Sequence, residues 1–262
     1  MYFIIAFFLG GPDVQLDKII IDTRSRNGWS AIDLGFRFAL RRYFSCTLLW
    51  LIVASPFLLI AYIQPFPLWV SYLFLWWVKP IIERPILYLF SRELFSQQVS
   101  IMDVLKNAKQ WLVPGWFIGL SLHRLSVSRS MYMSLTVLEG LRGNEYSKRT
   151  SVLGASDMSS KATWLTIMLC QIEQMFYFGC LAIVGLIFSN YVDFVEILIQ
   201  DDTIITIVIM VVVFAMVSPF YVAAGFMLYI SRRIELEGWD IELKFRNWMT
   251  SSDQTSVDNN ER

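Results

Sequence analysis

One unbroken apolar run most constrains how this chain folds. Residues 203–230 read TIITIVIMVVVFAMVSPFYVAAGFMLYI and contain no charged side chain. An α-helix crosses the hydrocarbon core of a bilayer with about 20 apolar residues, so this run is long enough to span a membrane. Arg232 and Arg233 follow at once, and basic residues mark the cytoplasmic end of a span. We expect a membrane-spanning helix that ends in the cytoplasm.

Three further stretches fit the same length rule. Residues 44–62 and 163–189 are each long enough to span. A run that begins at Leu68 reaches that length if it continues past the charged pair Glu83–Arg84. Lys79 and Pro80 interrupt this run, so we expect a broken or strongly tilted helix there, with the charged pair near the cytoplasmic boundary. Hydrophobic residues make up 56% of the chain, above the roughly 45–50% of soluble domains.

The charge distribution orients these spans. The segment 190–202 contains four acidic residues and no basic one, and the turn at 62–67 has no charge. All 22 Lys and Arg residues can be placed on the opposite side of the membrane. Because basic residues concentrate on the cytoplasmic side, we expect both termini in the cytoplasm. The predicted fold is an all-α integral membrane protein with about four transmembrane helices plus interfacial or re-entrant helices.

The chain divides into six predicted segments. They are an N-terminal cytoplasmic or interfacial segment at 1–43, a first transmembrane hairpin with a membrane-edge helix at 44–95, a cytoplasmic or interfacial helical region at 96–162, a second transmembrane hairpin at 163–230, a charged cytoplasmic helix at 231–248 and a disordered tail at 249–262. In the first segment, Ser30 and Asp33 predict a capping box that opens an amphipathic helix on the membrane face. In the third, Ser130 predicts the cap of a helix that ends near Gly140 or Gly143.

Glu173 is the sharpest candidate for a functional residue. It lies about ten residues into the predicted third span, between Gln171 and Gln174, whereas every other charge can be placed outside the hydrocarbon. An ionised carboxylate at that depth costs a few kcal/mol or more, so it must be protonated, paired or exposed to a wet cavity. A proton relay or a ligand site would explain it. A hydrogen bond between helices, or a span that begins later, would explain it as well.

Two groups of charged residues on the cytoplasmic side are candidate binding surfaces. The first is a basic patch that could hold anionic lipid headgroups, made of Arg124, Arg129, Arg142, Lys148 and Arg149. The second is a docking tail with alternating charge beside an anchoring Trp, made of Arg232, Arg233, Glu235, Glu237, Trp239 and Asp240. The general bias of basic residues toward the cytoplasm also explains the patch. Ion pairs within one helix, such as Arg233–Glu237, also explain the tail.

Motifs for catalysis, cofactors and metals are missing from the sequence. It has no phosphate-binding, dinucleotide-binding or nucleophile-elbow motif, so we expect no catalytic residue and no cofactor. His123 is the single histidine and has no HExxH or Cys–His spacing around it, so we expect no metal site. The formal net charge of zero argues against nucleic acid as a partner.

Three stretches resemble a family of uncharacterised bacterial inner-membrane proteins. They are GWSAIDLGFRFALRRYF, then ERPILYLFSRELF with LSVSRSMYMSLTVLEGLRG, and finally AGFMLYISRRIELEGWDIELKFR. The resemblance covers most of residues 16–248 and does not include the apolar residues 1–12. Genes of that family lie beside those for MoxR-type AAA ATPases, von Willebrand A-domain proteins and transglutaminase-like membrane proteins. The resemblance therefore implies a bacterial inner-membrane component of an envelope-maintenance or chaperone-like system.

The sequence leaves three functions open. The first is a non-enzymatic scaffold that contacts membrane lipids and docks a membrane or cytoplasmic protein partner through its cytoplasmic face. The absent motifs, the one-sided charge and the tail favour it. The second is a transporter or lipid-handling protein that uses Glu173 in a polar intramembrane cavity. The third, a membrane enzyme, would need a cluster of polar residues at one depth.

Overall fold

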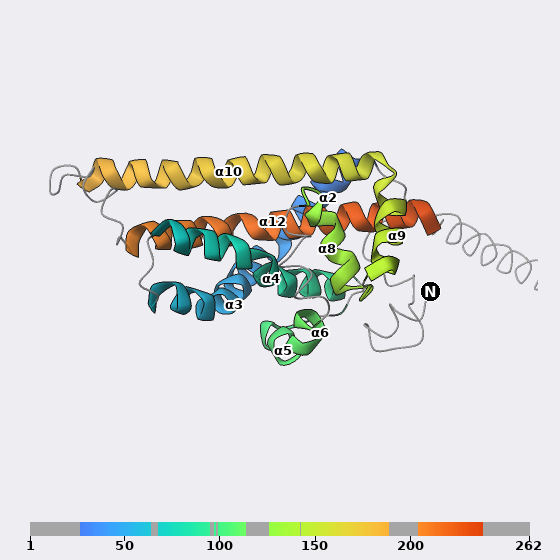
Figure 1. Ribbon diagram of the computed structural model, residues 1–262, viewed down its shortest axis with the longest axis horizontal. Helices are drawn as coiled ribbons and strands as arrows, with labels where there is room; N and C mark the ends of the chain where they lie inside the picture. The colour runs from blue at the N-terminus through green and yellow to red at the C-terminus, as the bar shows by residue number, and fades with distance from the viewer. Residues whose placement is uncertain are drawn as a thin grey trace, which may run out of the picture.

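A computed structural model describes residues 27–63, 68–94, 97, 99–113, 126–141, 143–188 and 204–237. The secondary structure in these ranges is entirely α-helical. In chain order the helices are α2 (Gly28–Arg41), α3 (Tyr43–Ile63), α4 (Leu68–Leu94), α5 (Ile101–Lys106), α6 (Ala108–Leu112), α8 (Arg129–Val137), α9 (Gly143–Gly154), α10 (Asp157–Phe188) and α12 (Ile204–Glu237). The elements are labelled in Figure 1.

Helix α12 is the central element of an elongated bundle (Figure 1). It packs against α2, α3, α4, α8 and α10. In its apolar window 67% of the residues are buried, against 28% for α3 and 17% for α10. A helix that is apolar all round is typical of a protein core or a membrane span, and α12 is the most deeply buried of these three helices in this bundle.

Small residues in α12 allow two helices to approach its backbone. A Cβ on Gly225 would lie 2.4 Å from the carbonyl oxygen of Ser130 on α8. On α2, a Cβ on Gly35 would lie 2.5 Å from the Cα of Ala224. Since only glycine permits backbones to meet this closely, both contacts depend on the missing side chain. Helix α2 therefore packs closely against α12; its predicted location at the membrane face stays a prediction.

Three of the described helices are long and apolar enough to cross a membrane. These stretches are Tyr43–Ala61, Asp157–Ile187 and Thr206–Leu236, and they match the predicted spans at 44–62, 163–189 and 203–230. The second predicted span corresponds to α4, whose 27 residues include two internal prolines, Pro80 and Pro85. Helix α4 is long enough to cross a membrane, but its charged residues make it less apolar than the other three helices. Helix α4 runs without interruption, so the predicted break does not occur.

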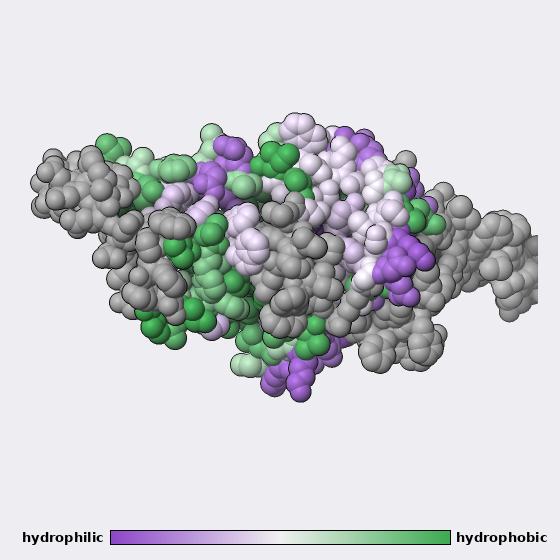
Figure 2. All heavy atoms as spheres, in the orientation of Figure 1, coloured by the Kyte–Doolittle hydropathy of each residue, from purple (hydrophilic) through white to green (hydrophobic). Residues whose placement is uncertain are grey.

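The outer faces of α3 and α10 expose large apolar side chains. Among them, Phe44 on α3 is 85% exposed, and Met175 and Leu186 on α10 are 68% and 77% exposed. Figure 2 shows hydrophobic residues over the α3–α4 region and hydrophilic residues around α8 and α9 at the opposite end. Apolar surface of this extent is typical of a region that contacts lipid or another protein.

The predicted cap of the first amphipathic helix, Ser30, lies three residues after the observed cap, Asn27. Helix α2 begins at Gly28 after Asn27, so Ser30 lies inside the helix and is not its cap. Asp33 instead pairs with Arg37, with 2.9 Å between Oδ2 and Nη2. Packing explains the earlier start, because Gly28 lies against α10, whereas a capping motif is a purely local signal.

The predicted cap of α8 is also wrong. Helix α8 begins at Arg129 and ends at Val137, so Ser130 lies within its first turn and is 1% exposed. Ser130 is buried because its backbone meets Gly225 of α12. A capping box that the sequence did not reveal opens α5, where the Ser100 side chain accepts from Met102 N and Asp103 accepts from Ser100 N.

Candidate functional site

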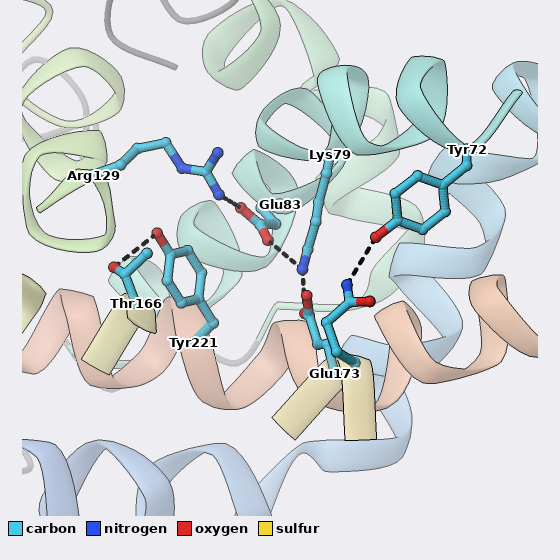
Figure 3. Close-up of polar contacts among 8 residues, drawn as sticks. Tyr72, Lys79, Glu83, Arg129, Thr166, Glu173 and Tyr221 are labelled. Atoms are coloured by element: carbon cyan, nitrogen blue, oxygen red, sulfur yellow. Dashed lines mark hydrogen bonds and ion pairs between the residues drawn. The ribbon is translucent and has the colours of Figure 1, made fainter. Parts of the chain in front are cut away.

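Four charged side chains from three helices meet inside the bundle (Figure 3). Lys79 and Glu83 come from α4, Arg129 opens α8 and Glu173 lies on α10. Lys79 and Glu173 are each 6% exposed, Glu83 is 0% exposed, and the Arg129 side chain is 12% exposed. We refer to these four residues as the ion cluster.

Charges of opposite sign alternate along the ion cluster. Lys79 Nζ donates a hydrogen bond to Glu173 Oε1 and lies 3.8 Å from Glu83 Oε1. The other carboxylate oxygen of Glu83 accepts from Arg129 Nη2 at 3.2 Å. The ionised cluster therefore contains two cations and two anions and has no net charge. Neutrality is what a group of buried charges requires, because an uncompensated charge in a low-dielectric interior is costly.

Helix geometry and α12 hold the two cations in place. Lys79 and Glu83 are four residues apart on α4, a spacing that puts them on one helix face. Lys79 Nζ lies 4.6 Å from the ring centre of Phe214, and the Arg129 guanidinium lies 5.4 Å from that of Tyr221. Cations are attracted to the faces of aromatic rings, so α12 supplies an aromatic support for both.

A cavity of about 220 Å³ lies beside the ion cluster. Its wall is formed by Trp76, Lys79, Ser126, Val127, Arg129, Thr166, Leu169, Cys170, Glu173 and Tyr221. Because a water molecule occupies about 30 Å³ of liquid, this space holds several waters or a small ligand. Tyr221 and Thr166 also present hydroxyl groups there, 3.5 Å apart. The wall thus combines two cations, one carboxylate, hydroxyl groups and an apolar part.

Two buried polar atoms of the cluster, Arg129 Nε and Glu83 Oε1, have no hydrogen-bond partner within the described part of the chain. Buried polar groups are nearly always hydrogen-bonded, either to protein or to ordered water. The Arg129 side chain as a whole is 12% exposed and lines the cavity.

The predicted intramembrane site is brought together only in part. Glu173 is buried and paired, while Gln174 donates to the hydroxyl of Tyr72 at 2.8 Å. Gln171 is exposed on the outer face of α10 and does not join them. Helix α10 begins at Asp157, well before Glu173, and the pairing of Glu173 with Lys79 on α4 agrees with the expected interaction between helices.

Sequence reasoning missed three of the four members of the ion cluster. It placed Lys79 and Glu83 at the membrane boundary, and it assigned Arg129 to a lipid-binding patch. The structure buries Lys79, Glu83 and Arg129 inside the bundle, which the sequence did not predict. Lys79 and Glu83 carry opposite charges four residues apart in an apolar stretch. This spacing could have indicated that the two side chains form a buried ion pair. No spacing in the sequence pointed to Arg129, because its partner lies 46 residues away.

The described members of the predicted basic patch do not form one exposed surface. Arg129 belongs to the ion cluster, and Arg149 Nε lies 3.5 Å from Glu139 Oε2 with its side chain 17% exposed. Lys148 is exposed on α9. Arg124 and Arg142 lie outside the described residues.

The predicted docking tail is partly built into the bundle. Arg233 is 5% exposed, donates to the Tyr229 hydroxyl at 3.2 Å and lies 3.9 Å from Glu139 Oε1. Tyr229 in turn donates to Glu139. Arg232 pairs with Glu235, with 2.7 Å between Nη1 and Oε2. Arg233 therefore ties the end of α12 to the segment after α8. Trp239, Asp240 and the side chain of Glu237 lie outside the described residues.

Comparisons with models of protein families, with curated proteins and with solved structures gave no match to this chain. Among the described residues, no three His, Cys, Asp or Glu side chains are grouped so as to hold a metal ion. What bears on function is therefore the chemistry of the ion cluster and the cavity beside it.

Proposed function

We propose that this chain is an integral membrane protein of four spans, in which α4 joins the three apolar helices. The burial of its charges supports this role for α4. Lys79, Glu83 and Arg84 are 6%, 0% and 2% exposed, so none of them faces the surroundings of the bundle. A charge near the middle of a span costs about 2.5–3.5 kcal/mol on insertion scales, and such residues face the bundle interior and pair there. Helix α4 meets both conditions.

We place the α8–α9 end of the bundle in the cytoplasm of a bacterium. Hydrophilic residues gather around this end in Figure 2, and the exposed Lys148 lies on α9. The opposite hairpin is linked by the segment 190–202, which is acidic and lacks basic residues. The positive-inside rule then puts both termini in the cytoplasm and the protein in the inner membrane. The resemblance to bacterial inner-membrane proteins supports the same location.

We infer that the protein transports a small polar solute or handles a lipid headgroup through the cavity. The observation that carries this inference is a cavity of about 220 Å³ with Lys79, Arg129 and Glu173 in its wall. Replacing buried ion pairs by apolar residues is often neutral or stabilising, so stability alone is a weak reason for them. Ionisable residues inside membrane proteins mark pathways for substrates, ions or protons.

The geometry gives less support to the two other functions. For a scaffold, Arg233 of the docking tail is buried against Glu139 and Tyr229, and much of the tail lies outside the described residues. For an enzyme, the required polar cluster at one depth exists. However, among the described residues that line the cavity there is no imidazole to activate the Cys170 thiol or a serine hydroxyl as a nucleophile.

Cys170 provides the test, because it lies in the cavity wall. In the variant C46A/C180A it is the single cysteine, and membrane vesicles are treated with a charged, membrane-impermeant methanethiosulfonate reagent. If the cavity holds water, Cys170 reacts. The matched control is C46A/C170A, which leaves Cys180 on the same helix and outside the cavity wall. We expect Cys170 to react at least about tenfold faster, since attack requires a hydrated thiolate. Equal protection of both cysteines would sink the proposal.

A further inference from the structure

We propose that the cavity binds a small monovalent oxyanion together with one proton, which Glu173 takes up. The inference rests on the proposed function and names the ligand class of the same cavity. The shared chemistry is a singly charged oxygen anion, such as a sulfonate, a carboxylate or a phosphate diester.

Charge balance in the ion cluster is the first argument. With every member ionised, Lys79 and Arg129 offset Glu83 and Glu173, and the cluster is neutral. A proton on Glu173 leaves one excess positive charge inside the bundle, and a bound monoanion restores neutrality. Net charge is costly in a membrane interior, so the two neutral states of the cluster are favoured. In one, neither the proton nor the anion is bound; in the other, both are bound. Proton and anion therefore promote each other's binding, as reciprocal linkage requires.

The contacts of the two carboxylates show which one takes the proton. Glu83 accepts from Arg129 at 3.2 Å, lies 3.8 Å from Lys79 and is fully buried. Glu173 is bonded to Lys79 alone among the cluster cations and borders the cavity. One cationic partner stabilises a carboxylate less than two do. A proton therefore goes to Glu173 and leaves the Glu83 pairs in place.

The surroundings of Glu173 contain further titratable and charged groups on every helix packed around it. They are Tyr72, Lys79 and Glu83 on α4, Arg129 on α8, Cys170 and Tyr177 on α10 itself, and Tyr221 on α12. Glu83 and Glu173 are the two carboxylates in this group, and Glu173 is the one that stands in the cavity wall. Glu173 is accordingly the carboxylate that a proton from the cavity reaches.

Two donors become available to an anion when Glu173 is neutral. Lys79 Nζ loses its charged partner on α10 and keeps Glu83 at 3.8 Å, so its remaining N–H groups can turn to the cavity. The Arg129 side chain, which is 12% exposed, stands in the same cavity wall. A guanidinium and an ammonium on one wall suit an oxyanion, because charge-assisted hydrogen bonds to such oxygens are among the strongest in proteins.

The test measures anion binding and proton uptake in one titration. The full chain in lipid nanodiscs is titrated with methanesulfonate in weakly buffered solution that contains a pH indicator dye. Methanesulfonate stays ionised throughout the working range, so it carries no proton of its own. We expect about one proton taken up per anion bound. The affinity should fall about tenfold per pH unit where Glu173 is ionised in the unliganded protein.

Two variants separate proton coupling from loss of folding. E173Q imitates the protonated carboxyl, so we expect it to bind methanesulfonate at all pH values without proton uptake. K79M/E173Q removes the ammonium but leaves the neutral Glu83–Arg129 pair, so it should fold and lose anion binding at least about tenfold. Circular dichroism and thermal melting of both variants check that the bundle is intact.

Three results would overturn the inference. They are anion binding by wild type without proton uptake, loss of binding in a folded E173Q, and binding of methylammonium in place of methanesulfonate. If Cys170 reacts with the aqueous thiol reagent while methanesulfonate does not bind, the inference fails and the proposed cavity function stands. If Cys170 is protected, the proposed function itself fails.

The lipid composition of the nanodiscs distinguishes two sources of the anion. Both lipids carry a phosphate diester, but the phosphatidylglycerol headgroup is a net monoanion, whereas the choline ammonium makes phosphatidylcholine zwitterionic. Competition between phosphatidylglycerol and methanesulfonate would support the inference with a lipid headgroup as ligand. Equal methanesulfonate affinity in both lipids would support it with a free solute as ligand.

Discussion

Glu83 is the residue on which the neutrality of the ion cluster depends most. It is fully buried and lies between Lys79 and Arg129, 3.8 Å from the first and 3.2 Å from the second. The two cations come from different helices, so one carboxylate links α4 to the start of α8. Removing its charge would leave both cations with Glu173 as their remaining partner in the cluster.

We therefore predict that E83Q destabilises the protein strongly. Breaking a buried ion pair by neutralising one partner costs about 3–5 kcal/mol, because an uncompensated charge stays buried. The matched control is D33N, which removes the exposed Asp33–Arg37 pair on α2, with 60% and 75% exposed side chains. Exposed pairs contribute about 0–1 kcal/mol. Denaturation in mixed micelles, followed by circular dichroism, compares the two. Similar losses in both variants would contradict the role given to Glu83.

At the scale of the element, glycine determines how closely helices approach α12. Gly225 meets the Ser130 backbone of α8, and a Cβ there would lie 2.4 Å from the carbonyl oxygen. Gly179 on α10 has no atom within 4 Å of the corresponding position. The two glycines lie in long helices and differ in whether another helix covers them.

We predict opposite effects for G225A and G179A. The first methyl group overlaps a backbone atom that cannot rotate away, so α8 must shift, and overpacking typically costs about 1–3 kcal/mol. The second enters open space and removes a helical glycine, which favours the helix by up to about 1 kcal/mol. Unfolding in mixed micelles measures both. Equal tolerance of the two substitutions would show that α8 does not press on Gly225.

The sequence predicted the long apolar helices correctly. It predicted less well where helices begin and which helices contact one another. Helices α3, α10 and α12 follow from uninterrupted apolar runs, because length and hydropathy are local properties. The caps at Ser30 and Ser130 were wrong, since packing against Lys161 and Gly225 determines those positions. Glu173 was found because a carboxylate in an apolar run is costly. Arg129 was not found as its neighbour, because that proximity exists only after four helices have assembled.

At the scale of the whole molecule, the two ends of the bundle differ in character. Helices α8 and α9 gather hydrophilic residues at one end, while the α3–α4 region displays hydrophobic ones (Figure 2). The outer face of α10 is apolar along much of its length. This polarity of the bundle sets its orientation across a membrane in the proposed arrangement.

We predict that single cysteines label this orientation from opposite sides. In a background free of the three native cysteines, K148C on the exposed face of α9 should react with an impermeant thiol reagent in inside-out vesicles only. N190C, at the start of the acidic segment 190–202, should react in right-side-out vesicles only. Labelling of both positions from the same side would mean that the chain does not cross the membrane once between them, and would refute the proposed crossing by α10.

The central position of α12 has a consequence for how the bundle is made. Helix α12 follows, along the chain, every helix that it packs against. Chains emerge from the ribosome from the N-terminus onward, so α4 and α10 are inserted before Phe214 and Tyr221 exist to cover Lys79 and Arg129. In the proposed membrane arrangement, pairing between Lys79, Glu83 and Glu173 would offset these charges during that interval. The ion cluster would then protect an unfinished bundle while its core helix is still being synthesised.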